Sequence, residues 1–419
     1  MSEHKQLTIG LFGFGVVGEG IYQVLQETPS LNASIKKICI RHPEKDRNAD
    51  KSLFTTDYDI LLNDPEINLI VELIDDAEEA YKIVTRALKN KKSVVSANKK
   101  LIAAHLPELL YLQQEHDVSF LYEAAVCGSI PIIRNLEEYY DNDLLQSLSG
   151  IVNGSTNYIL TKISEGLTYK EALQQAQQLG FAESNPQLDV EGYDATNKLT
   201  ILLAHAYGII TRPDDLVRTG ITRLHEADAR YAAEKGYRVK LTAQARKLSG
   251  GKVAAFVLPQ LVTQESQLFN VKNEFNGVIL ESKLADQQFL YGKGAGRFPT
   301  SSAVISDISA LSYDYRYEYK KLSRKEKYAL TNNYFLKLYV GFSNWTEVNK
   351  WDFEQVLEFH STDERQYITG LIHVEKLRSA SWYADPSVSI IVLPDGVIEK
   401  EAILARSLKK VSLQLAGVN

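Results

Sequence analysis

The feature that most constrains the fold of this chain is a glycine motif between an apolar run and a helical pattern near the start of the sequence. Residues 7–12 are apolar, and residues 16–26 carry valine, isoleucine and leucine at helical spacing. Gly13, Gly15 and Gly18 lie at the junction. Such glycines allow a tight turn, close approach to a pyrophosphate and packing of the helix on the strand, which favours dinucleotide binding. An ordinary glycine-rich turn is the alternative.

The first 130 residues continue this alternation of strand-like and helix-like segments. Further apolar runs predict strands at residues 36–40, 67–74, 93–96 and 119–122, and helical patterns predict helices at residues 78–89 and 106–114. Strands that alternate with helices predict an α/β fold with a Rossmann-like, doubly wound parallel sheet.

From about residue 131 the pattern changes to long helical segments and alternating strands, which predict an α+β domain. After a charged stretch at residues 313–331, the predicted order is strand 334–340, helix 352–358, strand 368–374, strand 388–393 and helix 398–410. That order resembles a small ferredoxin-like module. We therefore expect a nucleotide-binding domain at 1–131 plus 302–320, a second domain at 132–301 and a C-terminal module at 332–419.

The composition argues against several classes of protein. The 419 residues carry a formal net charge of −6, so the chain lacks the basic character typical of nucleic-acid binding. No run approaches the roughly 18 apolar residues of a membrane span, and the first residues do not resemble a secretory signal. We expect a cytoplasmic protein that binds neither nucleic acid nor membrane. Apolar neighbours around Cys39 and Cys127 favour buried, reduced thiols over a disulfide or metal pair.

The end of the second predicted strand bears on the choice of cofactor. An NAD site usually has Asp or Glu there to bind the ribose 2′-hydroxyl. This chain has Arg41 instead, followed by Lys45 and Arg47. Cations suit a 2′-phosphate, so the sequence favours NADP, with NAD still possible. The alternative is that these are solvated loop charges.

Two further segments could contact a ligand. Lys99 follows the strand at residues 93–96, and loops at the carboxyl ends of strands line the ligand crevice in open α/β sheets. Lys99 can therefore face the cofactor, although a surface lysine is the alternative. Gly292, Gly294 and Gly296 precede a predicted helix and indicate close backbone approach to a ligand. A flexible connection is the other interpretation.

Asp194 and Lys198 form the third segment of interest. They are four residues apart with the acid first, which is the spacing of a surface ion pair on a helix. Lys198, however, leads directly into the apolar run at residues 199–204. A lysine that is partly desolvated there could have a lowered pKa and exchange a proton near neutrality. The residues alone leave both interpretations open.

Taken together, these stretches resemble homoserine dehydrogenase from about residue 7 to residue 310. The most specific motifs are I-V-N-G-S-T-N-Y-I-L from residue 151, A-E at residues 182–183 with D-V-E-G-Y-D-x-x-x-K at residues 189–198, and G-x-G-A-G-x-x-P-T from residue 292. The stretches Y-E-A-A-V-x-G-S-I-P from residue 122 and V-V-S-A-N-K from residue 94 add to the match. Several separate motifs in the right order are stronger support than any single one.

The resemblance implies an NAD(P)-dependent enzyme that interconverts L-homoserine and L-aspartate 4-semialdehyde in threonine, methionine and isoleucine biosynthesis. It implies that Lys198 donates or accepts the proton, that Glu183 and Asp194 hold homoserine through its ammonium, and that Asp189 supports the site. It also implies a homodimer formed through the second domain.

The resemblance extends to the cofactor and to a cation. Besides the phosphate-loop glycines Gly13, Gly15 and Gly18, the positions that match cofactor contacts of the family are Val17, Arg41, Lys99, Gly180 and Gly294. Lys99 would also assist the proton transfer. A backbone-carbonyl site for a monovalent cation, usually sodium, is matched by Glu123, Val126, Gly128 and Ile130.

Two departures from the family pattern keep other functions open. Asp75 and Asp76 replace a usual Gly-Gly pair, and would repel a pyrophosphate unless they point to water. The expected module at residues 332–419 fits the ACT-like amino-acid-binding domains of some relatives, but G-F-S-N-W-T from residue 341 lacks their Asp-x-Pro-Gly turn. Threonine regulation and a purely structural or dimerising role are therefore both open. Alternative functions are a catalytically degraded NADP-binding sensor and an oxidoreductase for another hydroxy amino acid.

Overall fold

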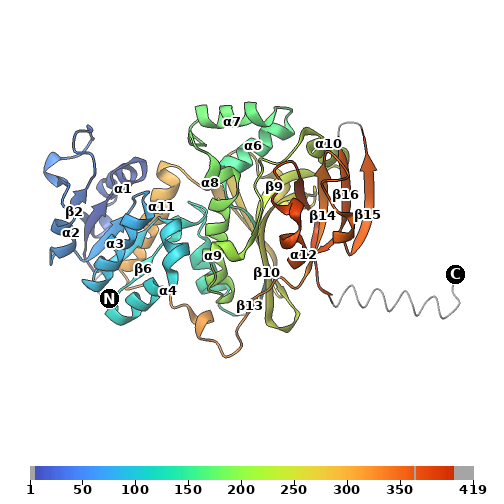
Figure 1. Ribbon diagram of the computed structural model, residues 1–419. Coiled ribbons are helices and arrows are strands. Elements are labelled where there is room, and N and C mark those ends of the chain that lie inside the picture. Colours follow the sequence, from blue (N-terminus) through green and yellow to red (C-terminus); the bar gives the residue numbers. More distant parts are fainter. Residues whose placement is uncertain (1–4, 143, 363–364, 401–419) are drawn as a thin grey trace. The chain divides into compact units, whose positions relative to one another are not determined.

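The computed structural model describes residues 5–142, 144–362 and 365–400 (Figure 1). The chain divides into two compact units, each assembled from separate stretches of sequence. Unit 1 comprises residues 1–143, 200–213 and 290–325, and unit 2 comprises residues 144–199, 214–289 and 326–419. The domain boundaries expected from the sequence stay a prediction.

Unit 1 contains a six-stranded parallel sheet in the order β3-β2-β1-β4-β5-β6. Its strands are β1 (Leu7–Phe12), β2 (Ala33–Cys39), β3 (Phe54–Thr55), β4 (Leu69–Glu72), β5 (Ser93–Ser96) and β6 (Phe120–Leu121). The chain runs outward from β1 in one direction and then from β4 in the other, so β1 and β4 form the switch point at which open α/β sheets bind ligands. The predicted doubly wound parallel sheet is confirmed.

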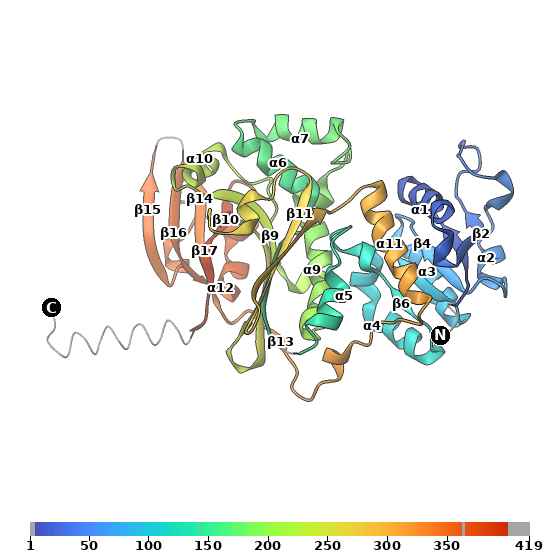
Figure 2. The same ribbon diagram turned by 180° about the vertical axis from the view of Figure 1, so that it is seen from behind.

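Helices of unit 1 accompany this sheet, and the first four of them connect its strands (Figure 2). They are α1 (Val16–Glu27), α2 (Asp59–Asn63), α3 (Ala77–Lys89), α4 (Lys99–His116), α5 (Ile132–Arg134) and α11 (Arg297–Leu311). Local signals explain where they begin: the side chains of Asp76 and Asn98 accept backbone N–H groups in the first turns of α3 and α4. Helix α11 comes from far along the sequence and packs beside α1.

Unit 2 is built on a mixed sheet in the order β12-β11-β7-β9-β10-β17-β14-β16-β15, with β8 and β13 paired to β10. Its strands are β7 (Leu145–Ile151), β8 (Val217–Arg218), β9 (Arg238–Leu248), β10 (Lys252–Val262), β11 (Phe275–Ser282), β12 (Asp286–Lys293), β13 (Ala329–Leu330), β14 (Phe335–Phe342), β15 (Gln355–Ser361), β16 (Gln366–His373) and β17 (Ser389–Ile398). Residues 290–293 of β12 are assigned to unit 1.

The α-helices that contain residues of unit 2 are α6 (Gly154–Ser164), α7 (Tyr169–Gln178), α8 (Gln187–Val190), α9 (Tyr193–Tyr207), α10 (Glu226–Glu234) and α12 (Val374–Ser379). Helix α9 continues into unit 1 from residue 200. Figure 1 shows helices α6 and α7 packed side by side at the top of this unit in the view. One hydrophobic core of unit 2 joins β10 to the last strands, with Phe256, Leu338, Ile390 and Trp382 among its buried members.

The last part of the chain differs from the expected module in two ways. Its strands continue the sheet of unit 2 through the β10–β17 pair, rather than forming a sheet of their own. The helix predicted at residues 352–358 is wrong, because residues 355–361 form β15, which pairs antiparallel with β16. Backbone pairing with a neighbouring strand outweighs a weak local helical preference. The helix predicted at residues 398–410 lies almost wholly outside the described residues.

Two expectations from composition can be compared with the described part of the chain. None of its helices combines the length and apolar character needed to cross a membrane. Cys39 and Cys127 are both free thiols, the first half-buried and the second buried. Burial raises the pKa of Cys39 to about 11, so its thiol stays protonated and weakly reactive near neutrality.

Lys240 is an unusual core residue of unit 2. It projects from β9 and is only 2% exposed, and its Nζ donates to Asn157 Oδ1 at 2.9 Å and to the Val271 carbonyl at 2.5 Å. Both acceptors are neutral. Burial, reinforced by the nearby charges of Arg238 and Lys272, lowers the pKa of Lys240 to about 7.

Lys240 should therefore make the stability of unit 2 depend on pH. In the unfolded chain its pKa returns to about 10.5, so between pH 7 and about 10.5 the unfolded state binds more protons than the folded state, and stability rises with pH. The slope is at most about 1.4 kcal/mol per pH unit. Lys240→Met should lose this rise, whereas Lys252→Met, which changes an exposed lysine of the same unit, should keep it.

Urea unfolding followed by tryptophan fluorescence measures this effect selectively. The three tryptophans of the chain, Trp345, Trp351 and Trp382, all belong to unit 2. If the stabilities of the wild type and Lys240→Met change in parallel between pH 7 and 10, the deduced titration of Lys240 is wrong.

Candidate functional site

The glycine motif has the close backbone contacts that the sequence analysis assigned to a phosphate loop. Gly13, directly after β1, has a φ of 94°, and a Cβ there would lie 2.8 Å from the Leu73 carbonyl oxygen. A Cβ on Gly18 would lie 2.5 Å from the Gly13 carbonyl oxygen. Gly15 is the N-cap of α1, and a Cβ there would have no neighbour within 4 Å. The backbone around Gly13 and Gly18 is thus closely packed, whereas the space beside Gly15 at the N-terminus of α1 is open. An open helix N-terminus suits an anion.

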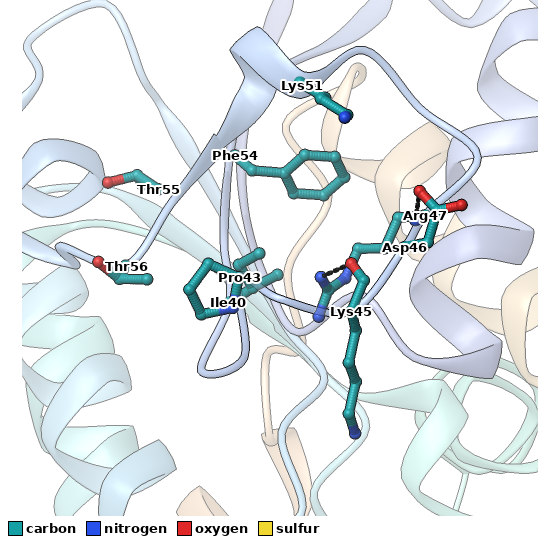
Figure 3. A pocket seen from close by; sticks show the side chains of 9 residues that line it. All are labelled: Ile40, Pro43, Lys45, Asp46, Arg47, Lys51, Phe54, Thr55 and Thr56. Atoms are coloured by element: carbon teal, nitrogen blue, oxygen red, sulfur yellow. Dashed lines mark hydrogen bonds between the residues drawn. The ribbon is translucent and has the colours of Figure 1, made fainter.

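A basic cavity of about 490 Å³ lies at the end of β2 (Figure 3). Its lining residues are Ile40, Pro43, Lys45, Asp46, Arg47, Lys51, Phe54, Thr55 and Thr56. The Arg47 guanidinium lies over the Phe54 ring at 5.7 Å, and its Nη1 donates to the Lys45 carbonyl at 2.7 Å. Three cationic side chains against one carboxylate make this cavity suitable for a phosphate group.

Arg41 and the Asp75–Asp76 pair lie near the same edge of the sheet. An Arg41 Nη2 atom is 3.9 Å from Asp76 Oδ2, and both side chains are at least half exposed. Asp76 Oδ1 accepts the N–H groups of Glu78 and Glu79. Asp76 is therefore used as a helix cap beside a cation, which reduces the repulsion expected toward a pyrophosphate.

Hydrogen bonds between the end of β4 with the loop after it and the end of β5 with the loop after it fix the start of helix α4, where Lys99 lies. The buried Glu72 accepts the Ile74 N–H at 2.7 Å and the Ser96 hydroxyl at 2.6 Å, and burial raises its pKa to about 7. Asn98 caps α4 and donates through Nδ2 to the Ile74 carbonyl at 3.0 Å. Lys99 is the first residue of α4 and is half-buried, at the carboxyl edge of the sheet.

The predicted cation loop, residues 123–130, surrounds a buried carboxylate. Glu123 Oε1 accepts the Ile133 N–H at 2.7 Å and Oε2 accepts the Arg134 N–H at 2.9 Å. Its own N–H donates to Asp307 Oδ2 at 2.9 Å. Burial raises the pKa of Glu123 to about 7 and that of Asp307 to about 8. The sequence analysis missed Asp307, which no motif marked.

The other members of this loop are enclosed by protein. Val126 and Ile130 are buried. A Cβ on Gly128 would lie 2.6 Å from the Gly294 carbonyl oxygen. The backbones of Gly128, a predicted cation ligand, and Gly294, a predicted cofactor contact, therefore lie against each other. Among the described residues, no three His, Cys, Asp or Glu side chains converge on a metal site.

In unit 2, the structure assembles Lys198, Asp194 and Asp189 around one asparagine. Lys198 Nζ donates to Asp194 Oδ2 at 2.6 Å and to the Val152 carbonyl at 2.7 Å. Asn153 Nδ2 donates to Asp194 Oδ2 at 2.8 Å and to Asp189 Oδ1 at 2.7 Å. Asp194 is 5% exposed and Lys198 is 8% exposed, so the alternative of a surface ion pair is wrong.

Glu183 and Gly180 lie apart from these contacts. Both follow α7, where Gly180 has a φ of 74° and no neighbour within 4 Å of its Cβ position. Glu183 is exposed, and its backbone carbonyl accepts from Gln177 Nε2 at 3.0 Å. In the described parts of the chain its carboxylate has no hydrogen-bond or ion-pair partner. It is thus available to a ligand, although no contact links it to Lys198.

Chemically, the cluster in unit 2 combines a nearly buried ammonium group with the Asp194 carboxylate and the Val152 carbonyl that hold it. Such a group can give a proton to, or take one from, an oxygen within hydrogen-bond reach. Asn153 is the member that the sequence analysis overlooked. The signal that could have identified it is an asparagine between a strand pattern and a helical pattern, which is a typical N-cap position.

Comparison with known proteins gives a consistent result. Residues 13–123 match the family model "Homoserine dehydrogenase, NAD binding domain", and residues 131–309 match the model "Homoserine dehydrogenase". Homoserine dehydrogenase from Bacillus subtilis strain 168 is 36% identical over 322 residues, which cover 74% of each chain.

Solved structures agree with this match. A homoserine dehydrogenase from Thiobacillus denitrificans superposes with a TM-score of 0.80 at 29% identity, covering 93% of this chain and 98% of that one. A mutant of a hyperthermophilic archaeal homoserine dehydrogenase, solved in complex with NADPH, has a TM-score of 0.64 at 27% identity and covers 74% and 99% of the two chains.

Proposed function

Because this chain belongs to the homoserine dehydrogenase family of NAD(P)-dependent oxidoreductases, which act in aspartate-family amino-acid biosynthesis, we propose that Lys198 carries the proton in the interconversion of L-homoserine and L-aspartate 4-semialdehyde. The observation that carries the proposal is the nearly buried Lys198–Asp194 pair, with the Lys198 ammonium held between a carboxylate and the Val152 carbonyl. The nicotinamide, when bound, supplies the hydride chemistry at carbon 4 of the amino acid.

The residues of this chain then manage one proton and the orientation of the substrate. In the oxidation of homoserine, a neutral Lys198 accepts the hydroxyl proton as hydride leaves carbon 4. In the reverse direction, the Lys198 ammonium donates a proton to the developing alkoxide. Asp189, Asp194 and the exposed carboxylate of Glu183 supply negative charge for the substrate ammonium. Lys99, at the edge of the sheet in unit 1, assists the proton transfer.

The test is an assay of homoserine-dependent reduction of NADP and of NAD. We expect turnover with homoserine and almost none with the analogue that lacks the α-ammonium group, because the negative charge of these carboxylates could then no longer bind and orient the substrate. Cofactor binding without turnover would instead support the degraded sensor, and turnover with only another hydroxy amino acid would support a different oxidoreductase.

We propose that NADP is preferred over NAD through Arg41 and the basic cavity lined by Lys45, Arg47 and Lys51. A charge-assisted hydrogen bond contributes roughly 1.5–3 kcal/mol, or about 10–100-fold in binding. Arg41→Ser should therefore lower kcat/KM for NADP by about 10–100-fold and leave the value for NAD nearly unchanged.

A charge-matched control for this prediction is Lys89→Ser, which removes an exposed cation from the last turn of α3. It should leave kcat/KM for both cofactors unchanged. An equal loss with NADP and NAD in Arg41→Ser would show that Arg41 does not recognise the 2′-phosphate.

We also propose that a monovalent cation, sodium, is held by the backbone carbonyls of Glu123, Val126, Gly128 and Ile130. The donor class fits, since carbonyl oxygens suit hard cations, and both carboxylate oxygens of Glu123 are already occupied by N–H groups. Replacing sodium by tetramethylammonium at constant ionic strength should lower the thermal midpoint of the protein. An unchanged midpoint argues against the site.

The proposed homodimer and ACT-like module rest on features of the second sheet. Strand β12 is an edge strand, with Leu284 beside it 81% exposed and Tyr291 on it 52% exposed, so it can pair with a second copy. A monomeric mass in light scattering would exclude this homodimer.

The order β17-β14-β16-β15 supports an ACT-like arrangement of the C-terminal module. An unchanged rate in a threonine titration would exclude threonine regulation. The cytoplasmic location stays a prediction, to be tested by fractionation.

A further inference from the structure

Asn153 lies at the point where β7 gives way to α6, and its side chain is almost fully used. It is 5% exposed, and Oδ1 accepts the Thr156 N–H at 2.8 Å and the Thr156 hydroxyl at 3.0 Å. An amide has one oxygen and two N–H donors. Because the oxygen is fixed by capping α6, the amide nitrogen must point the opposite way, toward the two carboxylates.

Each of the carboxylates comes from a different helix. Asp189 belongs to α8 and Asp194 belongs to α9, and Asn153 Nδ2 donates to one oxygen of each, at 2.7 Å and 2.8 Å. Two carboxylates within reach of one amide group repel each other. The shared donor offsets this repulsion and fixes the direction of both groups.

The same short segment also holds the ammonium group. Lys198 Nζ donates to the carbonyl of Val152, the residue before Asn153, and to Asp194 Oδ2, the oxygen that Asn153 contacts. Val152 and Asn153 therefore contact both members of the Lys198–Asp194 pair. The Val152 carbonyl accepts from the cation, and the Asn153 side chain donates to the anion. If Asn153 is shortened, Asp194 loses this donor, and its carboxylate is no longer held in the same direction relative to the Lys198 ammonium.

We propose that Asn153 is a positioning residue for proton transfer, which acts by holding the carboxylates of Asp194 and Asp189 and, through Asp194, the Lys198 ammonium. This inference rests on the proposed function of Lys198. It assigns Asn153 no contact with substrate or cofactor. Small displacements of reacting groups are costly, since an error of about 1 Å can lower a rate about 10²-fold.

The test uses Asn153→Ser in the full-length chain. Serine keeps an oxygen that can cap α6 but lacks the amide that bridges the two carboxylates. We expect kcat per NADPH-binding site to fall about 10–100-fold, a range typical of lost supporting hydrogen bonds, while the dissociation constant for NADPH stays within about twofold of the wild-type value. Thr168→Ala, which removes the N-cap of α7 in the same unit, is the matched control for a lost helix cap and should keep the wild-type kcat.

A double-mutant cycle separates positioning from a general structural role. If Asn153 acts through Asp194, Asn153→Ser should cause little further loss of kcat in an Asp194→Asn background, because the group that it positions is already altered. Equal losses in both backgrounds, or a wild-type kcat in Asn153→Ser, would overturn the inference while leaving the proposed function intact. A wild-type chain that fails to oxidise homoserine would instead overturn the proposed function, and this inference with it.

Discussion

Replacing Lys198 by alanine is expected to lower kcat for homoserine oxidation by about 10²–10⁴-fold, which is the usual contribution of a general acid or base. The substrate hydroxyl would then lose the amine that Lys198 now places between Asp194 and the Val152 carbonyl to take its proton. Asn153 still donates to Asp194 in this variant, so the carboxylate keeps a partner and the fold should persist. Steady-state kinetics, together with circular dichroism and NADPH titration, would measure both effects.

Two further variants make this result specific to Lys198. Lys198→Arg should also be nearly inactive, because a guanidinium with a pKa above about 12 does not release its proton near neutrality. Lys162→Ala changes another lysine of unit 2 that pairs with an acid, Glu165, at the C-cap of its helix, and should keep full activity. Near-normal turnover in Lys198→Ala would end the proposed mechanism.

The second large effect is expected from the phosphate loop. Gly18→Ala would place a Cβ 2.5 Å from the Gly13 carbonyl oxygen, and this contact is with backbone that cannot rotate away. The loop must therefore shift, which misdirects the N–H groups at the start of α1. Losing one or two charge-assisted hydrogen bonds to a pyrophosphate should raise the dissociation constant for NADPH by at least about 10-fold.

Gly15→Ala separates the fold of this loop from cofactor binding. A Cβ at Gly15 has no protein atom within 4 Å, so the thermal midpoint of this variant should equal that of the wild type. The methyl group would nonetheless occupy the open side of the loop, and affinity for NADPH should fall. In Gly18→Ala, by contrast, both the midpoint and the affinity should fall. If neither variant binds NADPH more weakly, the motif is only a turn.

Much of the nucleotide-binding half was predictable because its determinants are local. Gly18 is constrained by the Gly13 carbonyl of its own loop, and apolar runs separated by helical patterns define a parallel sheet. The tail was less predictable. Residues 355–361 have no strong preference of their own, and they form β15 because β16 offers a partner strand that the local sequence does not reveal.

The sequence by itself determined the family, the parallel sheet, the glycine loop and the spacing of Asp194 and Lys198, since each depends on residues that are close along the chain. Only the tertiary structure decided that this ion pair is buried and that Asn153, 41 residues from Asp194, holds it in place. It also decided that Asp307, 184 residues from Glu123, accepts the backbone N–H of Glu123 through Oδ2. Burial and hydrogen bonding depend on which distant segments pack together, and no local pattern of residues carries that information.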